Sequence, residues 1–152
     1  MTELPTGTVT LLFSDIEGST VLLLRLGSTY AEALDGQRRV LRKAWAEHGG
    51  VELGTEGDSF YVVFSTAPDV VAAAAQAQRE LADYEWPAGE QVRVRMGIHT
   101  GNPTVHDGAY VGMDVHRAAR IAGAAHGGQV VMSSATAELV GGQLPDEVAL
   151  RD

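Results

Sequence analysis

The stretch from Leu11 to Thr20 reads Leu-Leu-Phe-Ser-Asp-Ile-Glu-Gly-Ser-Thr. The apolar run that ends at Phe13 is typical of a strand that is buried on both faces. Asp15 follows this run, and a loop of small residues then leads into a leucine-rich segment with helical character. A carboxylate at a strand end, beside a loop that opens a helix, is suited to hold a metal ion and a phosphate group. The alternative is that Asp15 only caps the following helix, a position that aspartate favours.

The composition predicts one soluble globular domain over residues 1–152, with 45% hydrophobic and 20% charged residues. The net charge of -9 argues against binding of a nucleic acid backbone. The chain has no cysteine, which excludes disulfides, thiolate zinc sites and thiol nucleophiles. Because the N-terminus has no basic, apolar leader and no apolar run reaches membrane-spanning length, we expect a cytoplasmic protein without a membrane partner.

Hydrophobic periodicity and turn residues predict an alternation of strands and helices. Strands are expected at 6–15, 51–55, 59–64, 92–99 and 129–132, and helices at 19–26, 28–47, 68–84, 112–125 and 133–139. Ser28 is the expected N-cap of the second helix, and residues 100–108 read as a loop or irregular arm. Since 56–58 read as a hairpin turn, a mixed α+β sandwich fits better than a parallel doubly wound sheet.

Asp58 lies in that hairpin turn. If the first strand pairs beside the hairpin, Asp15 and Asp58 converge at one end of the sheet. Two carboxylates together with a backbone carbonyl form an oxygen-ligand site for Mg²⁺ or Mn²⁺. Two such ions can hold the attacking and leaving oxygens in phosphoryl chemistry. The alternative is that Asp58 is an ordinary turn aspartate.

His116 and Arg120 stand four residues apart and so share one face of a predicted helix. The small residues Ala118 and Ala119 allow this helix to pack closely. Arg120 could then offer a planar fork of donors to the charge that develops on a transferring phosphoryl group. The alternative is a solvated basic face without a role in chemistry.

Taken together, four motifs of the chain resemble the class III nucleotide cyclase catalytic domain. They are Phe-Ser-Asp-Ile-Glu-Gly-Ser-Thr at 13–20, Thr-Glu-Gly-Asp-Ser-Phe at 55–60, Met-Gly-Ile-His-Thr-Gly at 96–101 and Tyr-Val-Gly-Met-Asp-Val-His-Arg-Ala-Ala-Arg-Ile at 110–121. Their order and spacing match from Gly7 to about Leu139. The chain looks most similar to the actinobacterial branch, whose cyclase domains are often fused to ATPase and transcription-regulator modules.

The resemblance implies a ferredoxin-like α/β sandwich, with a mostly antiparallel sheet, that acts as a head-to-tail homodimer. Asp15 and Asp58 match the aspartates that bind two Mg²⁺ or Mn²⁺ ions, and the carbonyl of Ile16 would join them. Arg120, from the other subunit, matches the arginine that stabilises the transition state. The loop that matches the triphosphate-binding segment consists of Glu17, Gly18, Ser19 and Thr20. The implied reaction converts a nucleoside triphosphate, expected to be ATP, into a 3′,5′-cyclic nucleotide and pyrophosphate.

The chain also departs from the family pattern. Gly54 stands where adenylate cyclases of this class carry a base-reading lysine, and Ala109 stands where they carry an aspartate. His116 replaces the asparagine that orients the ribose, and the chain ends before the family's C-terminal hairpin. Loss of a polar side chain that hydrogen-bonds the base can reduce discrimination between bases by about 10⁴-fold. We therefore expect weak or promiscuous cyclisation that prefers Mn²⁺. The alternatives are a degenerate regulatory module that binds nucleotide or dimerises, and a structural dimer without a ligand.

Overall fold

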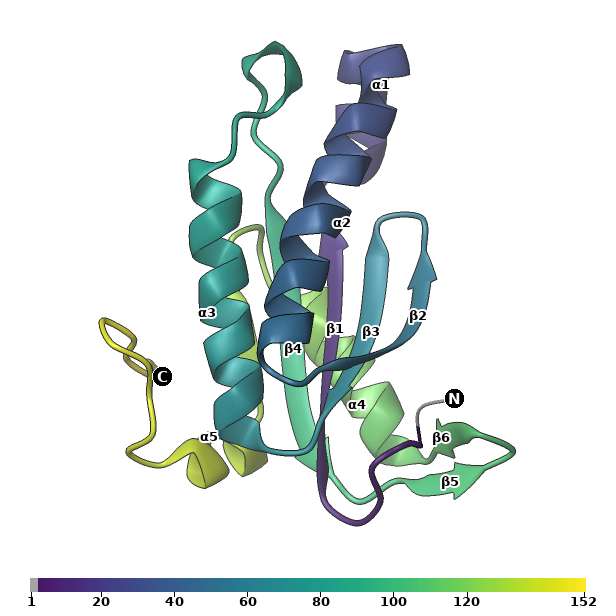
Figure 1. Ribbon diagram of the computed structural model, residues 1–152, viewed down its shortest axis with the longest axis vertical. Coiled ribbons are helices and arrows are strands. Elements are labelled where there is room, and N and C mark those ends of the chain that lie inside the picture. The colour runs from purple at the N-terminus through teal and green to yellow at the C-terminus, as the bar shows by residue number, and fades with distance from the viewer. Residues whose placement is uncertain (1–2) are drawn as a thin grey trace.

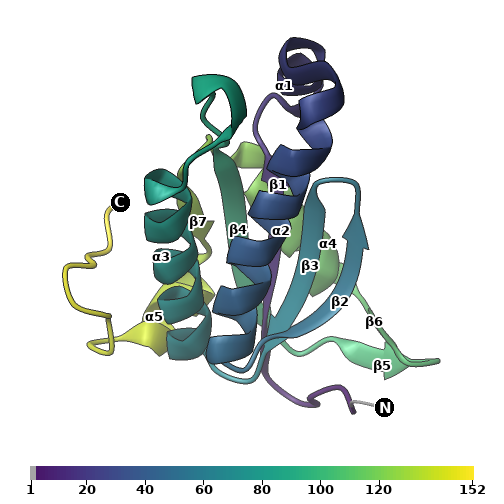
Figure 2. The same ribbon diagram turned by 45° about the horizontal axis from the view of Figure 1, so that its top comes forward.

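The computed structural model describes residues 3–152 and has a five-stranded sheet with the strand order β2-β3-β1-β4-β7 (Figure 1, with β7 labelled in Figure 2). Its strands are β1 (Val9–Ile16), β2 (Val51–Glu56), β3 (Ser59–Phe64), β4 (Val94–Gly101) and β7 (Val130–Met132). All neighbours are antiparallel except β4 and β7, which run parallel. The predicted mixed α+β sandwich with a mostly antiparallel sheet is confirmed.

Helices cover both faces of the sheet. One face carries α2 (Tyr30–Glu47), α3 (Ala67–Asp83) and α5 (Ser134–Val140), and the other carries α4 (Met113–Ala124), as Figures 1 and 2 show together. The short helix α1 (Ser19–Leu26) continues through the 3₁₀ turn η1 (Gly27–Thr29) into α2, and η2 (Pro87–Gly89) lies between α3 and β4. No helix among residues 3–152 is both long and apolar enough to cross a bilayer.

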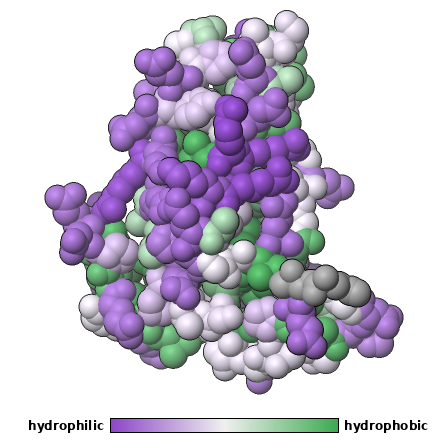
Figure 3. Space-filling view, viewed as in Figure 1, coloured by the Kyte–Doolittle hydropathy of each residue, from purple (hydrophilic) through white to green (hydrophobic). Residues whose placement is uncertain are grey.

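β1 is central, and both of its faces are buried as its sequence predicts. Leu12 and Ile16 belong to the large core under α2 and α3, whereas Val9 and Leu11 belong to a smaller core under α4. This division follows from the alternation of side chains along a strand. The outer face of α2 is hydrophilic (Figure 3), which gives that helix one apolar and one polar side.

Gly97 lets α4 approach the sheet closely. A Cβ at this position of β4 would lie only 2.0 Å from the backbone nitrogen of Ala122 in α4. Since no side chain fits between the two backbones, Gly97 fixes the depth at which α4 sits on the sheet. The same helix carries His116 and Arg120, so this contact also sets where those side chains project.

The structure corrects the sequence predictions in two places. The segment expected as an irregular arm contains β5 (Thr104–His106), which pairs with β6 (Ala109–Val111) in a two-stranded ribbon. Asp107 and Gly108 turn the chain there with φ angles of 51° and 76°, a geometry that Asp-Gly favours in tight hairpins. Ser28 does not cap α2, because it lies inside η1 and the helix begins at Tyr30 without a side-chain cap.

Candidate active site

The structure brings the β2–β3 turn against the end of β1. The backbone N–H of Ile16 donates a hydrogen bond of 2.7 Å to Oδ2 of Asp58. The cause is the sheet order, since β1 pairs with β3 and the turn before β3 therefore lies beside the last residues of β1. Asp15 precedes Ile16 in the chain, so the two predicted metal-binding aspartates lie at the same end of the sheet.

The carboxylate of Asp15 is paired with Arg95 on the neighbouring strand β4. The two residues are cross-strand partners, with Nε to Oδ1 at 2.5 Å and Nη2 to Oδ2 at 3.0 Å. Hydrogen bonding to Asp15 raises the pKa of Arg95. Asp15 does not cap α1, because Gly18 occupies the N-cap and no side chain bonds the first turn. The capping alternative for Asp15 is therefore wrong.

The loop from Glu17 to Thr20 leads from β1 into α1. Gly18 adopts a left-handed conformation with φ of 65°, and Ser19 and Thr20 begin the helix. Glu17 is fixed at both its backbone and its side chain: its N–H donates to the carbonyl of Arg93 at 2.8 Å, and its Oε2 accepts from the N–H of Gly127 at 2.7 Å. The Glu17 carboxylate is thus directed to the segment between α4 and β7.

Gly54 lies on β2 at an irregularity of the β2–β3 register. Among residues 3–152, apart from its chain neighbours, a Cβ at Gly54 would meet no atom within 4 Å, so the backbone does not require glycine there. The residue lines a shallow hollow of about 420 Å³ together with Phe13 and Tyr61, whose rings stack with centroids 4.3 Å apart. Burial raises the pKa of Tyr61 to about 12.

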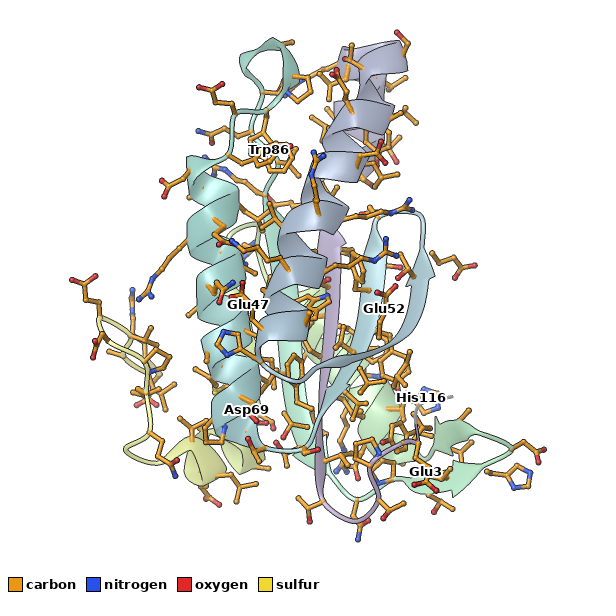
Figure 4. The ribbon with its side chains drawn as sticks, in the orientation of Figure 1. Glu3, Glu47, Glu52, Asp69, Trp86 and His116 are labelled. Atoms are coloured by element: carbon orange, nitrogen blue, oxygen red, sulfur yellow. The ribbon has the colours of Figure 1, made fainter. Side chains whose placement is uncertain are left out.

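Ala109 and His116 lie toward the other end of β1 from Asp15. Arg120 lies on α4 shortly before Gly123, whose carbonyl accepts from Nη1 of Arg95 at 3.4 Å. Ala109 is exposed on the β5–β6 ribbon, which follows the end of β4 and so lies near the start of β1. His116 projects from α4 beside this ribbon (Figure 4) and is exposed, as is Arg120. Within the part of the chain that the structure describes, the side chains of His116 and Arg120 form no hydrogen bond or ion pair. One copy of the chain therefore gives these two side chains no bond to Asp15 or Asp58 among residues 3–152.

The acidic end of β1 has the ligand types that a hard divalent cation requires. Asp15 and Asp58 offer carboxylate oxygens and Ile16 offers a backbone carbonyl, and each carboxylate oxygen can accept more than one bond. Among residues 3–152 no cluster of three or more His, Cys, Asp or Glu side chains is arranged to hold a metal. Further ligands would have to come from a bound phosphate or from water, as is usual for Mg²⁺.

Two residues at this site were not singled out from the sequence. Arg95 reads as the wet face of an alternating strand, and only the β1–β4 register places it opposite Asp15. Gln37 lies in a helix and reads as a surface residue, yet it is fully buried and donates to the carbonyl of Asp58 at 3.1 Å. For Arg95, the only signal in the sequence was its place on a strand next to the acidic end of another strand. For Gln37, the sequence had no signal.

Comparison with known proteins identifies the family. The family described as the adenylate and guanylate cyclase catalytic domain matches residues 1–147. The chain is 42% identical over 150 residues to an uncharacterized protein of Mycobacterium tuberculosis, covering 97% of this chain and 50% of that protein. It is 32% identical to an adenylate cyclase of Lachancea kluyveri, over 86% of this chain and 8% of the yeast protein. The chain thus spans about half the length of the mycobacterial relative and a small part of the fungal one.

Solved structures agree with this assignment. An adenylate cyclase of Trypanosoma brucei in its monomeric state superposes with a TM-score of 0.85 at 28% identity, over 93% of this chain and 80% of that one. The guanylate cyclase domain of RhGC from Catenaria anguillulae, solved in complex with GTP, superposes with a TM-score of 0.80 at 22% identity, over 90% of this chain and 83% of that one. The latter likeness concerns the fold alone. The chain belongs to the family of class III adenylate and guanylate cyclase catalytic domains.

Proposed function

We propose that this chain is a nucleotide cyclase domain that converts a nucleoside triphosphate, with ATP as the expected substrate, into a 3′,5′-cyclic nucleotide and pyrophosphate. The observation that carries the proposal is the hydrogen bond of 2.7 Å between the Ile16 amide and Asp58. This bond joins the β2–β3 turn to Ile16, the residue after Asp15. The carboxylates of Asp15 and Asp58 therefore lie at the same end of the sheet, beside the loop that leads into α1.

In this proposal Asp15, Asp58 and the carbonyl of Ile16 hold Mg²⁺ or Mn²⁺, with two ions at each site. Bound there, the ions would offset the charge of the triphosphate and favour ionisation of the attacking hydroxyl. The loop of Glu17, Gly18, Ser19 and Thr20 binds the phosphates. The left-handed Gly18 and the first amides of α1, which no side chain caps, support this role because helix N-termini attract anions.

The reaction is a single displacement. The ribose 3′-oxygen forms a bond to the α-phosphorus, the bond from that phosphorus to the bridging oxygen breaks, and pyrophosphate leaves. The 3′-hydroxyl loses its proton to a nearby base or to solvent. Because no covalent enzyme intermediate forms, catalysis depends on positioning and on stabilisation of charge.

A second copy of the chain is needed in this proposal. Arg120 and His116 are exposed on α4, and Ala109 is exposed on the β5–β6 ribbon. A head-to-tail homodimer would let Arg120 of the second copy stabilise the charge on the α-phosphate, while His116 lies near the ribose. The exposed apolar side chains of Val105, Val111 and Met113 on and beside the ribbon support an interface in this region.

A second candidate is a degenerate cyclase domain that binds nucleotide, or dimerises, without turnover. The open space at Gly54 and the exposed Ala109 favour it, because neither residue can hydrogen-bond a base through its side chain. In that case a fused or partner module would use the nucleotide-bound state as its signal. Binding of Mn²⁺ and ATP without any cyclic product would support this second candidate.

The direct test is incubation of the purified protein with ATP or GTP and Mn²⁺, followed by chromatographic measurement of the cyclic product. We expect slow formation of product by the unmodified chain and none by the Asp58→Ala variant. Equal product from both proteins would contradict the proposal. A thermal shift with Mn²⁺ and ATP, absent for Asp58→Ala, would separate binding from turnover.

The shared site has its own test. Asp58→Ala and Arg120→Ala are each expected to abolish activity, and a mixture of the two should recover part of it. Recovery is expected because a mixed dimer contains one site with an intact Asp58 and an intact Arg120. If mixtures shown to contain mixed dimers remain inactive, each chain must build its own site.

A further inference from the structure

Gln37 is a buried polar residue in the middle of α2. It has no exposed surface, although glutamine is mostly found at protein surfaces. Its Nε2 donates to the backbone carbonyl of Asp58 at 3.1 Å, and its Oε1 is buried without a hydrogen-bond partner among residues 3–152. One end of this amide is therefore satisfied by the β2–β3 turn, whereas the other end is not.

A half-satisfied buried amide is unfavourable for the stability of the fold. A buried acceptor without a partner costs free energy, and an apolar side chain of the same shape would avoid that cost. The neighbouring buried positions of α2, such as Val40 and Leu41, are apolar. Core packing therefore does not explain why position 37 is a glutamine. The hydrogen bond from Gln37 to the Asp58 carbonyl does explain it.

The turn that carries Asp58 is held from two directions. From β1, the Ile16 amide binds the Asp58 side chain. From α2, Gln37 binds the Asp58 carbonyl, and Nη2 of Arg38 donates to the carbonyl of Gly57 at 2.7 Å. Gly57 itself has a φ of 58°, as a tight turn requires. The helix thus fixes the backbone of the turn and leaves the carboxylate aimed at the end of β1.

We infer that Gln37 is a positioning residue that holds the Asp58 carboxylate in place for a divalent cation. This inference rests on the proposed function, in which Asp58 binds Mg²⁺ or Mn²⁺. Groups that orient a ligand of a metal ion typically contribute about 10- to 100-fold to metal affinity. Gln37 itself touches neither the cation nor the substrate, and it acts only through the turn.

The test replaces Gln37 with methionine, which has a similar length and no donor. Gln78→Met is the matched control, because Nε2 of Gln78 in α3 also donates to a backbone carbonyl, that of Val94, at 2.8 Å. Three quantities are measured for each protein: the thermal midpoint, the affinity for Mn²⁺ with a non-cyclisable ATP analogue, and the exchange rate of the Ile16 amide by NMR. Gln37→Leu serves as a second variant if methionine does not pack.

We expect Gln37→Met to change the thermal midpoint little, because removal of a buried acceptor without a partner offsets loss of the hydrogen bond to the Asp58 carbonyl. Its affinity for Mn²⁺ should fall about tenfold, and the Ile16 amide should exchange faster. Gln78→Met should leave both the affinity and the Ile16 amide unchanged. Rescue is expected with Gln37→His, whose ring can again donate a hydrogen bond to the turn.

Two outcomes would overturn the inference. One is an unchanged Ile16 exchange rate and Mn²⁺ affinity in Gln37→Met. The other is an equal loss in Gln37→Met and Gln78→Met that follows their thermal midpoints, which is the result expected of a purely structural role. If the unmodified protein binds no Mn²⁺ with nucleotide, the proposed function fails, and the Ile16 exchange rate alone then decides whether Gln37 positions the turn.

Discussion

The backbone amide of Ile16 donates a 2.7 Å hydrogen bond to Oδ2 of Asp58, which fixes the β2–β3 turn against the end of β1. Asp58→Asn keeps an oxygen that can accept this bond but removes the charge. We expect its stability to change by less than about 1 kcal/mol. Its Mn²⁺ affinity should fall at least about tenfold, and its cyclase activity about 100-fold or more. Calorimetric titration measures the Mn²⁺ affinity, and product assays measure the cyclase activity.

Asp83→Asn is the control for that substitution, because Asp83 is exposed at the end of α3 and changes the net charge equally. It should leave Mn²⁺ affinity and activity within about twofold of the unmodified chain, since Asp83 is exposed on another element and salt screens exposed charges. Equal losses in the two variants would show that net charge, and not the place of Asp58, governs cation binding.

Arg95 neutralises Asp15 across the β1–β4 pair. Because a positive charge at that carboxylate opposes binding of a cation, Arg95→Met should strengthen the binding of Mn²⁺ alone, by about three- to tenfold. Its stability should change by only about 0–1 kcal/mol, because both side chains are about one-third exposed, at 32% and 34%. Titration of free Mn²⁺ measures the effect, and Arg93→Met controls for the lost charge. Weaker Mn²⁺ binding in Arg95→Met would instead mean that Arg95 holds Asp15 in a binding geometry.

The open space at Gly54 permits a gain of base discrimination. In the described chain, no atom beyond the neighbours of Gly54 in sequence lies within 4 Å of a Cβ at Gly54, and Ala109 is exposed. Gly54→Lys combined with Ala109→Asp should therefore fold normally. If the base lies beside these positions, the preference for ATP over GTP should rise at least about tenfold. Competition assays with both nucleotides measure this ratio. Gly54→Ala is the control, and a ratio that does not differ between the two variants would place the base elsewhere.

Asp114 contributes to stability in a pH-dependent way. His99 lies with Nε2 at 2.9 Å from Oδ1 of Asp114, and this hydrogen bond holds the pKa of the Asp114 carboxyl below its ordinary value of 3.8. A carboxyl with a lowered pKa stabilises the fold above its unfolded pKa, and this contribution is lost as the pH falls through the folded pKa. Asp114→Asn should therefore lower the free energy of unfolding at pH 6 by roughly 1–2 kcal/mol.

The difference between Asp114→Asn and the unmodified chain should shrink as the pH falls from about 5 to about 2. Urea unfolding at several pH values measures it. Asp107→Asn is a suitable control, because the Asp107 side chain is 91% exposed and should give no such slope. A difference that is constant over this range would mean that Asp114 acts through packing and not through its charge.

The close approach of α4 to β4 predicts a large effect at Gly97. Gly97→Ala would place a Cβ 2.0 Å from the Ala122 nitrogen, so α4 must shift, and we expect a loss of about 3 kcal/mol. A Cβ at Gly123, in α4 itself, meets no atom of the rest of residues 3–152 within 4 Å outside its own helix backbone. Gly123→Ala should therefore stabilise the helix by up to about 1 kcal/mol. Thermal unfolding compares the two variants. A mild effect of Gly97→Ala would show that α4 can move on the sheet.

Local patterns predicted most elements of the fold. Helix α1 at Ser19–Leu26 and strand β3 at Ser59–Phe64 lie where the sequence places them, because apolar periodicity and glycine-containing turns are properties of short segments. The β5–β6 ribbon was missed, since each of its strands spans only three residues and carries no readable alternation. The family assignment was also available from the sequence, as four motifs in order are far more specific than any one of them.

The sequence by itself determined the family, the mixed α+β architecture and the candidate roles of Asp15 and Asp58, because motifs and periodicity are written along the chain. Only the tertiary structure decided that Arg95 pairs with Asp15, that Glu17 binds Gly127 and that Gln37 holds the Asp58 turn. These contacts join residues 80, 110 and 21 positions apart. They depend on strand register and helix packing, which result from burial over the whole domain and leave no local signature in the sequence.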